Sequence, residues 1–134
     1  PIGKADIVRS GEDVTVLCSQ LMRKFTEQAA KEAEKEGISV EIVDPRTIKP
    51  FDIETVSKSV KKTGRAMIVH EHPVFGGTGG EHGCQIYQEC FRELKKSVMR
   101  IGRAEVPIPY GQEEYMVFPT KESILQNIRT IVKN

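Results

Sequence analysis

The stretch Asp44-Pro-Arg-Thr-Ile-Lys-Pro-Phe-Asp52 joins a short apolar segment to an amphipathic one. The preceding residues 38–43 (ISVEIV) are rich in β-branched side chains, which favour a strand. Pro45 and Pro50 interrupt any helix between them, and the Asp52 side chain is suited to cap the helix that follows. We therefore predict a strand, a stiff bend and a helix start. The stretch contains no nucleophile, metal cluster or phosphate loop, so its pattern indicates architecture.

Strand-like and helix-like segments alternate along the rest of the chain. Short β-branched or apolar runs predict strands at 14–18, 38–43, 66–69 and 97–101. Apolar residues at helical spacing predict helices at 20–36, 53–62, 81–94 and 121–132, with Ser19, Asp52 and Thr120 as N-caps. The uninterrupted apolar run 66–69 is typical of a strand buried on both faces of a mainly parallel sheet. This order predicts an α/β fold, a three-layer α/β/α sandwich with right-handed crossovers.

Composition limits the classes of function. The 134 residues and 15.0 kDa fit a single domain, residues 1–134, with one core. The 20 basic and 19 acidic residues are interleaved, which argues against a nucleic-acid surface. No apolar run approaches the ~20 residues that cross a bilayer, so we expect no membrane partner.

The cysteines and the start of the chain carry two further expectations. Cys18, Cys84 and Cys90 have no Cys-x-x-Cys spacing, which disfavours a disulfide framework or a zinc site and favours a reducing, intracellular compartment. The chain opens on Pro1 without a Met, in an extended-looking segment. We interpret residues 1–10 as a lead-in from a preceding domain, and the chain as a fragment of a longer polypeptide.

Metal-type ligands gather only around His70-Glu71-His72, with His82 ten residues further on. Alternate residues of a strand point to opposite faces, so His70 and His72 cannot both bind one ion while the strand stays regular. We therefore expect a polar cluster at a strand end and no metal site. No catalytic residue is assigned from the sequence.

A glycine-rich loop, residues 76–80, precedes the third predicted helix. A helix N-terminus with free N–H groups attracts anions, which makes Gly79, Gly80 and Glu81 a candidate anion site. The loop lacks the Lys-Ser/Thr ending of a phosphate-binding loop, and His82 stands where a Gly-x-Gly-x-x-Gly pattern requires its third glycine. The favoured interpretation is that small residues let the helix approach the sheet closely.

Two other groups of residues have plain structural interpretations. Cys84 and Cys90 lie on or near the apolar stripe of the third helix, and we expect both to be buried, inert thiols. Glu113 and Glu114 beside Tyr115 predict an exposed acidic segment.

Four motifs together resemble a known family. They are Asp44 to Asp52, Val69-His-Glu-His, Gly76-Gly-Thr-Gly-Gly-Glu81 and Glu105-Val-Pro-Ile-Pro-Tyr110. In order and spacing they resemble the C-terminal domain of the transketolase family, most closely that of the β subunit of the thiamine-diphosphate-dependent first component of 2-oxo acid dehydrogenase complexes. The resemblance covers nearly the whole chain. It implies a mixed five-stranded sheet with one antiparallel edge strand, which we expect near Val117.

The resemblance also implies a role. Such parent enzymes oxidatively decarboxylate a 2-oxo acid and transfer the acyl group to lipoamide, with thiamine diphosphate and magnesium held by other domains. Neither the Gly-Asp-Gly motif nor the activating glutamate of those domains can be matched here, so we expect no cofactor in this domain and no catalysis by the domain alone. The motifs leave the substrate open between pyruvate and branched-chain 2-oxo acids.

The resemblance implies partners as well: an α subunit, a second β subunit and the subunit-binding domain of the acyltransferase core. Docking in the family involves acidic residues and the C-terminal end, which makes Glu122 and the Asn134 carboxylate the candidates here. The compartment would be the cytoplasm of a bacterium, or the mitochondrial matrix or plastid of a eukaryote.

Two alternative functions stay open. The chain could be a free-standing regulatory domain that binds an anion or nucleotide at the helix after Gly80. It could also be the C-terminal domain of transketolase or deoxyxylulose-phosphate synthase, which share the fold that the resemblance implies.

Overall fold

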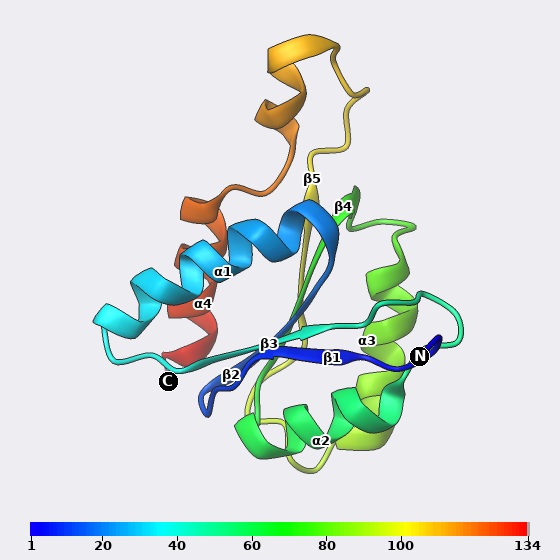
Figure 1. Cartoon of the computed structure of the whole chain (residues 1–134), viewed down its shortest axis with the longest axis vertical. Coiled ribbons are helices and arrows are strands. Elements are labelled where there is room, and N and C mark those ends of the chain that lie inside the picture. Colours follow the sequence, from blue (N-terminus) through cyan, green and yellow to red (C-terminus); the bar gives the residue numbers. More distant parts are fainter. Residues whose placement is uncertain (134) are drawn as a thin grey trace.

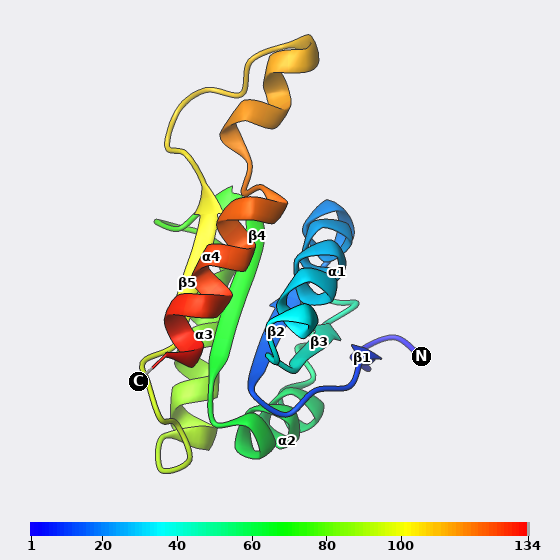
Figure 2. The ribbon, with the colours of Figure 1, turned by 90° about the vertical axis from the view of Figure 1, so that its left-hand side faces the viewer.

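A computed structural model describes residues 1–133 and shows a five-stranded sheet between two layers of helices (Figures 1 and 2). The elements in chain order are β1 Asp6–Arg9, β2 Val14–Cys18, α1 Gln20–Lys35, β3 Val40–Asp44, α2 Ile53–Thr63, β4 Ala66–Pro73, α3 Thr78–Cys90, β5 Met99–Arg103, the 3-10 helix η1 Gly111–Val117 and α4 Lys121–Val132. The predicted three-layer α/β/α sandwich is confirmed.

The strands lie in the order β1-β3-β2-β4-β5, and only β1 runs antiparallel to its neighbour. The mixed sheet is therefore confirmed, but the expected position of its antiparallel strand is wrong. Val117 ends η1, whereas the antiparallel edge is β1, near the start of the chain. β1 is short and half exposed, and its pairing with β3 shifts register between Ile7 and Arg9. For these reasons the alternation of apolar and polar residues does not predict this strand.

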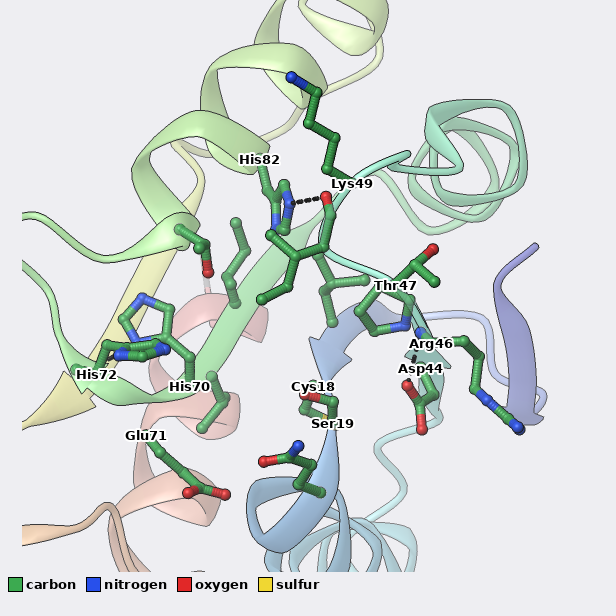
Figure 3. Close-up of a pocket in the computed structure, with 17 residues that line it drawn as sticks. Cys18, Ser19, Asp44, Arg46, Thr47, Lys49, His70, Glu71, His72 and His82 are labelled. Atoms are coloured by element: carbon green, nitrogen blue, oxygen red, sulfur yellow. Dashed lines mark hydrogen bonds between the residues drawn. The ribbon is translucent and has the colours of Figure 1, made fainter. Parts of the chain in front are cut away.

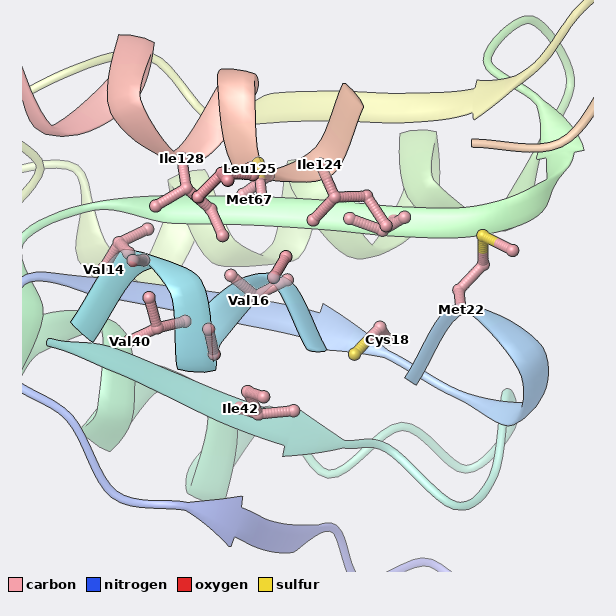
Figure 4. Packing of buried hydrophobic residues seen from close by; sticks show 14 of the residues in the cluster. Val14, Val16, Cys18, Met22, Val40, Ile42, Met67, Ile124, Leu125 and Ile128 are labelled. Atoms are coloured by element: carbon pink, nitrogen blue, oxygen red, sulfur yellow. The ribbon is translucent and has the colours of Figure 1, made fainter. Parts of the chain in front are cut away.

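The two faces of the sheet carry separate cores. α1 and α4 cover one face, where Val16 and Ile42 meet Met22, Ile124 and Ile128 (Figure 4). α2 and α3 cover the other face and pack on a second cluster: Leu17, Val43, Val56, Val60, Ala66, Ile68, Ile86 and Cys90. Successive strand residues point to opposite faces, which is why β2 and β4 supply side chains to both cores.

Two of the three predicted N-caps, Asp52 and Thr120, form capping hydrogen bonds. Asp52 accepts a hydrogen bond from the Thr55 N–H at 3.2 Å, and α2 stops at Gly64, whose φ is 72°. Thr120 and Ser123 form a reciprocal capping box at α4. Ser19 occupies the N-cap position of α1, but its side chain makes no capping hydrogen bond within the described residues.

Several element bounds differ from the predicted ones. β4 continues through the histidine cluster to Pro73 because β5 pairs alongside it, and α3 begins at Thr78 and not at Glu81. On α1 the buried stripe is Met22, Thr26, Ala29, Ala30 and Ala33, whereas Leu21 and Phe25 lie at its margin and are only partly buried. No helix among residues 1–133 is both long and apolar enough to cross a membrane.

Candidate functional site

The main hollow of the described structure lies where the strand order reverses. From β2 the chain crosses first to β3 on one side and later to β4 on the other, which leaves a crevice at the carboxyl ends of these strands. Open α/β sheets bind ligands at such positions. The crevice encloses about 770 Å³ (Figure 3). It is lined by Leu17 to Gln20, Asp44 to Lys49, Ile68 to His72, Thr78 and His82.

The end of β2 and the start of α1 form one wall of the crevice. Gln20 opens the helix with a φ of 51°, a left-handed conformation that is unfavourable for a side chain with a Cβ. The next amide, Leu21 N–H, donates to Glu71 Oε1 at 3.2 Å. Glu71 comes from β4, so a carboxylate of the neighbouring strand already occupies part of the positive end of α1.

The loop after β3 forms the opposite wall. Asp44 is buried and accepts from the Arg46 N–H at 2.9 Å and from the Arg23 guanidinium at 3.2 Å. Arg46 also has a left-handed φ, 61°. Thr47 donates its hydroxyl to Pro50 O at 2.7 Å, and the Lys49–Pro50 peptide is cis. The predicted stiff bend is therefore built by side chains as well as by the two prolines.

Asp52 closes this loop and ties it to the N-terminal segment. It caps α2 and also accepts from the Ala5 N–H at 3.0 Å. Its burial alone would raise the pKa of the Asp52 carboxyl, but hydrogen bonds from Ala5 and Thr55 hold that pKa below its ordinary value. The Asp52 side chain thus connects the start of α2, the bend before it and the N-terminal segment at Ala5.

Three histidines border the crevice, and two of them are partly or fully buried. His70 Nδ1 donates to His72 O at 2.9 Å. The His82 ring stacks on Phe51 at 4.0 Å, and its Nε2 donates to Ile48 O at 3.3 Å. Burial lowers the pKa of both His70 and His82, so both rings are neutral near pH 7. Within residues 1–133 no three His, Cys, Asp or Glu side chains are grouped as metal ligands.

The glycines of the predicted anion site lie inside α3. A Cβ at position 79 would stand 2.6 Å from His70 Nε2, and one at position 77 would stand 2.6 Å from Pro73 O. Gly80 donates its N–H to Gly77 O at 3.1 Å. The geometry supports the interpretation that small residues bring α3 against β4, whereas the anion site at Gly79, Gly80 and Glu81 stays a prediction.

The predicted docking residue Glu122 is not among the residues that line the crevice. Glu122 is exposed in the first turn of α4, with its carboxylate 3.7 Å from Lys121 Nζ. Asn134 lies outside the described residues. Glu113, Glu114 and Tyr115 are exposed, as predicted.

The cysteines divide into two kinds. Burial raises the pKa of Cys18 to about 12 and also raises that of Cys90, as expected for inert thiols. The prediction for Cys84 is wrong, because this thiol is exposed on α3. The buried stripe of α3 is Gly79, His82, Gly83, Ile86 and Cys90, and the helical turn directs Cys84 away from it.

Gln20 and Arg46 are two crevice residues whose backbone conformation the sequence did not predict. Their left-handed conformation is usual for glycine, so the residue type hides the backbone geometry. For Arg46, its place directly after an Asp-Pro pair indicates a turn but not a left-handed φ.

Comparison with known proteins places these features in a family. The family model described as "Transketolase, C-terminal domain" matches residues 3–124. The β subunit 2 of mitochondrial 2-oxoisovalerate dehydrogenase from Arabidopsis thaliana is 41% identical over 98% of this chain and 37% of its own length. The mitochondrial pyruvate dehydrogenase E1 β subunit from Pisum sativum is 43% identical over 94% of this chain and 35% of its own. The corresponding subunit from Acholeplasma laidlawii is 39% identical over 99% and 41%.

Solved structures agree with this placement. A split-gene transketolase, described as an inactive β4 tetramer, matches 97% of this chain and 41% of its own with a TM-score of 0.77 and 27% identity. A 2-oxoglutarate:ferredoxin oxidoreductase from Magnetococcus marinus matches 97% of this chain and 19% of its own with a TM-score of 0.61, but at 12% identity it shows the fold alone. The chain spans less than half the length of each of these relatives.

Proposed function

This chain belongs to the family of transketolase C-terminal domains, and we propose that it is the assembly and partner-docking domain of the β subunit of a 2-oxo acid dehydrogenase. The observation that carries the proposal is the similarity to named β subunits, up to 43% identity over nearly the whole chain. The chain covers at most 41% of those subunits, so the reaction and partners are proposed for a parent of which this domain is a part.

In this proposal the parent oxidatively decarboxylates a 2-oxo acid and transfers the acyl group to lipoamide. Pyruvate and 2-oxoisovalerate enzymes both occur among the relatives, so the substrate is one of these two classes. Some relatives are mitochondrial and others bacterial, which supports the matrix or the cytoplasm as the compartment.

Thiamine diphosphate and magnesium would supply the decarboxylation chemistry in the parent. The residues of this chain do not fit that cofactor. The sequence contains no Gly-Asp-Gly, and among residues 1–133 no set of three side chains is arranged to bind a metal ion. We therefore assign no chemical step to this domain and place its role in contacts with an α subunit and a second β subunit.

A chimera tests the assembly role. This chain replaces the corresponding C-terminal part of the Acholeplasma laidlawii pyruvate dehydrogenase β subunit, which is 39% identical to it, and is co-expressed with that enzyme's α subunit. We expect a tagged α subunit to co-purify with the chimera and the complex to decarboxylate a 2-oxo acid. A chimera that is folded by circular dichroism but does not retain the α subunit would contradict the proposal.

The docking residue needs a separate experiment. Glu122 is an exposed carboxylate at the start of α4, where a cationic partner can reach it. We expect Glu122→Lys to weaken binding of the acyltransferase subunit-binding domain about tenfold, by replacing attraction with repulsion. Glu89→Lys, an exposed glutamate on α3 across the sheet, is the matched control and should bind unchanged. Equal affinity of wild type and Glu122→Lys would remove Glu122 from the docking surface without affecting the assembly role.

The crevice favours a second candidate, an anion- or nucleotide-binding regulatory domain. It lies at the carboxyl ends of parallel strands and has a volume of about 770 Å³, within the usual range of small-molecule sites. Calorimetry of the chain with nucleotides and with thiamine diphosphate separates the candidates. Micromolar binding of a nucleotide would support regulation, whereas no binding is the result expected for an assembly domain.

A further inference from the structure

The first turn of α3, residues 78–80, is weakly secured. Its N-cap, Gly77, has no side chain to cap the helix, whereas side chains cap α2 and α4. Two of the three residues of the turn are glycines, and glycine is a poor helix former. Further along, Ile86 and Cys90 anchor α3 in the core beneath α2 and α3. The first turn can therefore leave the sheet while the rest of the helix stays in place.

The His70 side chain, on β4, packs directly against this turn (Figure 3). A Cβ at Gly79 would lie 2.6 Å from His70 Nε2, and one at Gly77 would lie 3.0 Å from the same nitrogen. Gly79 is buried, and so is His70 Nε2, which has no hydrogen-bond partner in the part of the chain that the structure describes. The imidazole and the glycine backbone therefore enclose this nitrogen between them.

The other ring nitrogen fixes where the proton of neutral His70 lies. Nδ1 is 2.9 Å from His72 O, and a carbonyl oxygen only accepts hydrogen bonds. Nδ1 therefore carries the proton, and Nε2 carries only its lone pair. A protonated Nε2 would need an acceptor, and none lies within hydrogen-bond distance of it among residues 1–133.

The positive groups near His70 oppose a second proton on the ring. Arg100, on β5, lies beside the same turn, with its Nη1 3.2 Å from the Cβ position at Gly80, and the centroid of the His72 ring is 6.0 Å from that of His70. Burial lowers the pKa of His70 most, and the charges of His72 and Arg100 lower it further, against the effect of the hydrogen bond to His72 O. The amino-terminal end of α3 is itself positive.

The carboxylates and the other histidine nearby are engaged elsewhere. Glu71, next to His70 on β4, accepts from a backbone N–H at the start of α1 at 3.2 Å. Glu81, on α3, is exposed and accepts from a glutamine one turn further along the helix at 2.9 Å. His82, also on α3, donates to Ile48 O. Among residues 1–133 the His70 side chain is hydrogen-bonded to a carbonyl and to no carboxylate.

From this geometry we infer that His70 is a proton-sensitive contact that controls one wall of the crevice. When Nε2 takes up a proton, the first turn of α3, which lines the crevice at Thr78, moves off β4, and Nε2 gains water as its partner. A proton that binds the open form better than the closed form shifts the population towards the open form. The inference concerns access to the crevice and does not depend on the proposed assembly role.

The direction of the pH effect follows from this linkage. The open form leaves His70 in water near its ordinary pKa of 6.5, whereas burial in the closed form lowers that pKa. The closed form is therefore fully favoured above about pH 6.5, and the open fraction rises as pH falls below that value. One proton changes the opening constant by at most about tenfold per pH unit.

Amide hydrogen exchange of the chain, followed residue by residue by NMR, tests the inference. The Gly80 N–H, which donates to Gly77 O at 3.1 Å, reports on the first turn of α3. The Ile124 N–H, which donates to Thr120 O at 2.9 Å, is the internal control, since α4 contains no histidine. We expect the opening constant of Gly80, corrected for the exchange rate of a free amide, to rise at least about threefold more than that of Ile124 between about pH 7 and pH 5.

Two glutamine variants assign the effect to one ring. His70→Gln removes the titratable group next to the turn, so the opening constant of Gly80 should no longer rise relative to that of Ile124. His72→Gln is the matched control, because His72 is exposed and its backbone carbonyl remains as the acceptor for His70. This variant should keep the pH dependence of the wild type. Circular dichroism verifies that both variants are folded.

Nitrogen NMR of the wild type gives a second measurement that needs no variant. We expect neutral His70 to carry its proton on Nδ1 and to titrate below pH 6.5. A proton on Nε2 of the neutral ring, or a Gly80 opening constant that rises no more than that of Ile124, would overturn the inference. A folded His70→Gln variant with the pH dependence of the wild type would overturn it as well.

Discussion

Gly79 stands where a side chain of any size would meet the imidazole of His70. A Cβ there would lie 2.6 Å from His70 Nε2 and 3.3 Å from Ile68 Cγ2, and both neighbours belong to β4 in the middle of the molecule. His70 is held by its hydrogen bond to His72 O and cannot move freely. The glycine is therefore a packing requirement between α3 and β4.

We predict that Gly79→Ala lowers the free energy of unfolding by about 2 kcal/mol, because a crowded contact outweighs the better helix propensity of alanine. Gly83→Ala on the same helix is the control. Its Cβ would meet nothing closer than 3.6 Å, so we expect it to be neutral or to stabilise by about 1 kcal/mol. Urea unfolding measures both. Equal stabilities of the two variants would disprove the packing role.

The buried histidines make stability depend on pH. Burial holds the folded-state pKa values of His70 and His82 below the ordinary 6.5 of the unfolded chain. The unfolded state then binds more protons at acid pH, so their contribution is complete above about pH 6.5 and is lost as pH falls through the folded pKa values. The depressed pKa of Asp52 acts in a separate window, below its ordinary 3.8.

We therefore predict that the free energy of unfolding falls between about pH 7 and pH 5 and that His82→Gln makes this fall shallower. Glutamine keeps a donor for Ile48 O but carries no titratable ring. Urea unfolding at several pH values provides the measurement. A variant with the same pH dependence as the wild type would show that His82 does not titrate in this range.

At the scale of elements, the start of α2 joins three parts of the chain. Asp52 caps the helix, follows the bend 44–50 directly, and accepts the Ala5 N–H that brings in the N-terminal segment. Thr120 caps α4 through Ser123 alone. Both side chains accept a backbone N–H in the first turn of their helix, but only Asp52 also holds the N-terminal segment.

We predict that Asp52→Ala costs about 2 kcal/mol of stability and Thr120→Ala about 1 kcal/mol. Only the Asp52→Ala change also leaves the Ala5 N–H without its acceptor. Thermal unfolding of both variants checks the difference. The expectation fails if Thr120→Ala is the more damaging change.

Local chemistry predicted some elements well and others poorly. β2 and α4 are as predicted because their apolar patterns and flanking caps agree. α3 starts earlier than predicted because packing against His70 draws Gly79 and Gly80 into the helix, a tertiary effect that overrides the low helix propensity of glycine. η1 has no apolar periodicity, and nothing in residues 111–117 distinguishes it from a loop.

The crevice, like the fold, could be predicted only in part from the sequence. The turn after Asp44 could be read from two prolines, and the histidine cluster from its composition. The crevice itself arises from strand order, which joins Gln20, Arg46 and Glu71 from segments far apart in the chain. No local pattern carries that information.

For the molecule as a whole, an ion pair between the partly exposed Lys62 and the buried Glu41 joins three segments at one end of the sheet. Glu41, near the start of β3, is 1% exposed, and its Oε2 accepts from Lys62 Nζ and from the Gly11 N–H. The hydrogen bond to Glu41 raises the pKa of the Lys62 ammonium group. The pair connects the strand, the end of α2 and the turn before β2.

We predict that Lys62→Met destabilises the protein by about 3 kcal/mol, because it leaves a buried carboxylate without its cation. Glu41→Gln/Lys62→Met should recover most of that loss. Lys58→Met breaks only an exposed pair with Glu54 and should change stability by less than about 1 kcal/mol. Denaturant titration of these variants decides, and a Lys62→Met protein as stable as the wild type would refute the pair's role.

The position of β1 bears on the order in which the protein acquires its structure during synthesis. Among the strands of this sheet β1 is the first to leave the ribosome, yet its only partner in the sheet is β3, which follows more than thirty residues later. It must therefore wait, unpaired, until α1 and β3 have been made. Because it then joins an outer edge with an irregular register, its amide hydrogens should exchange with solvent sooner than those of β2, which is enclosed on both sides.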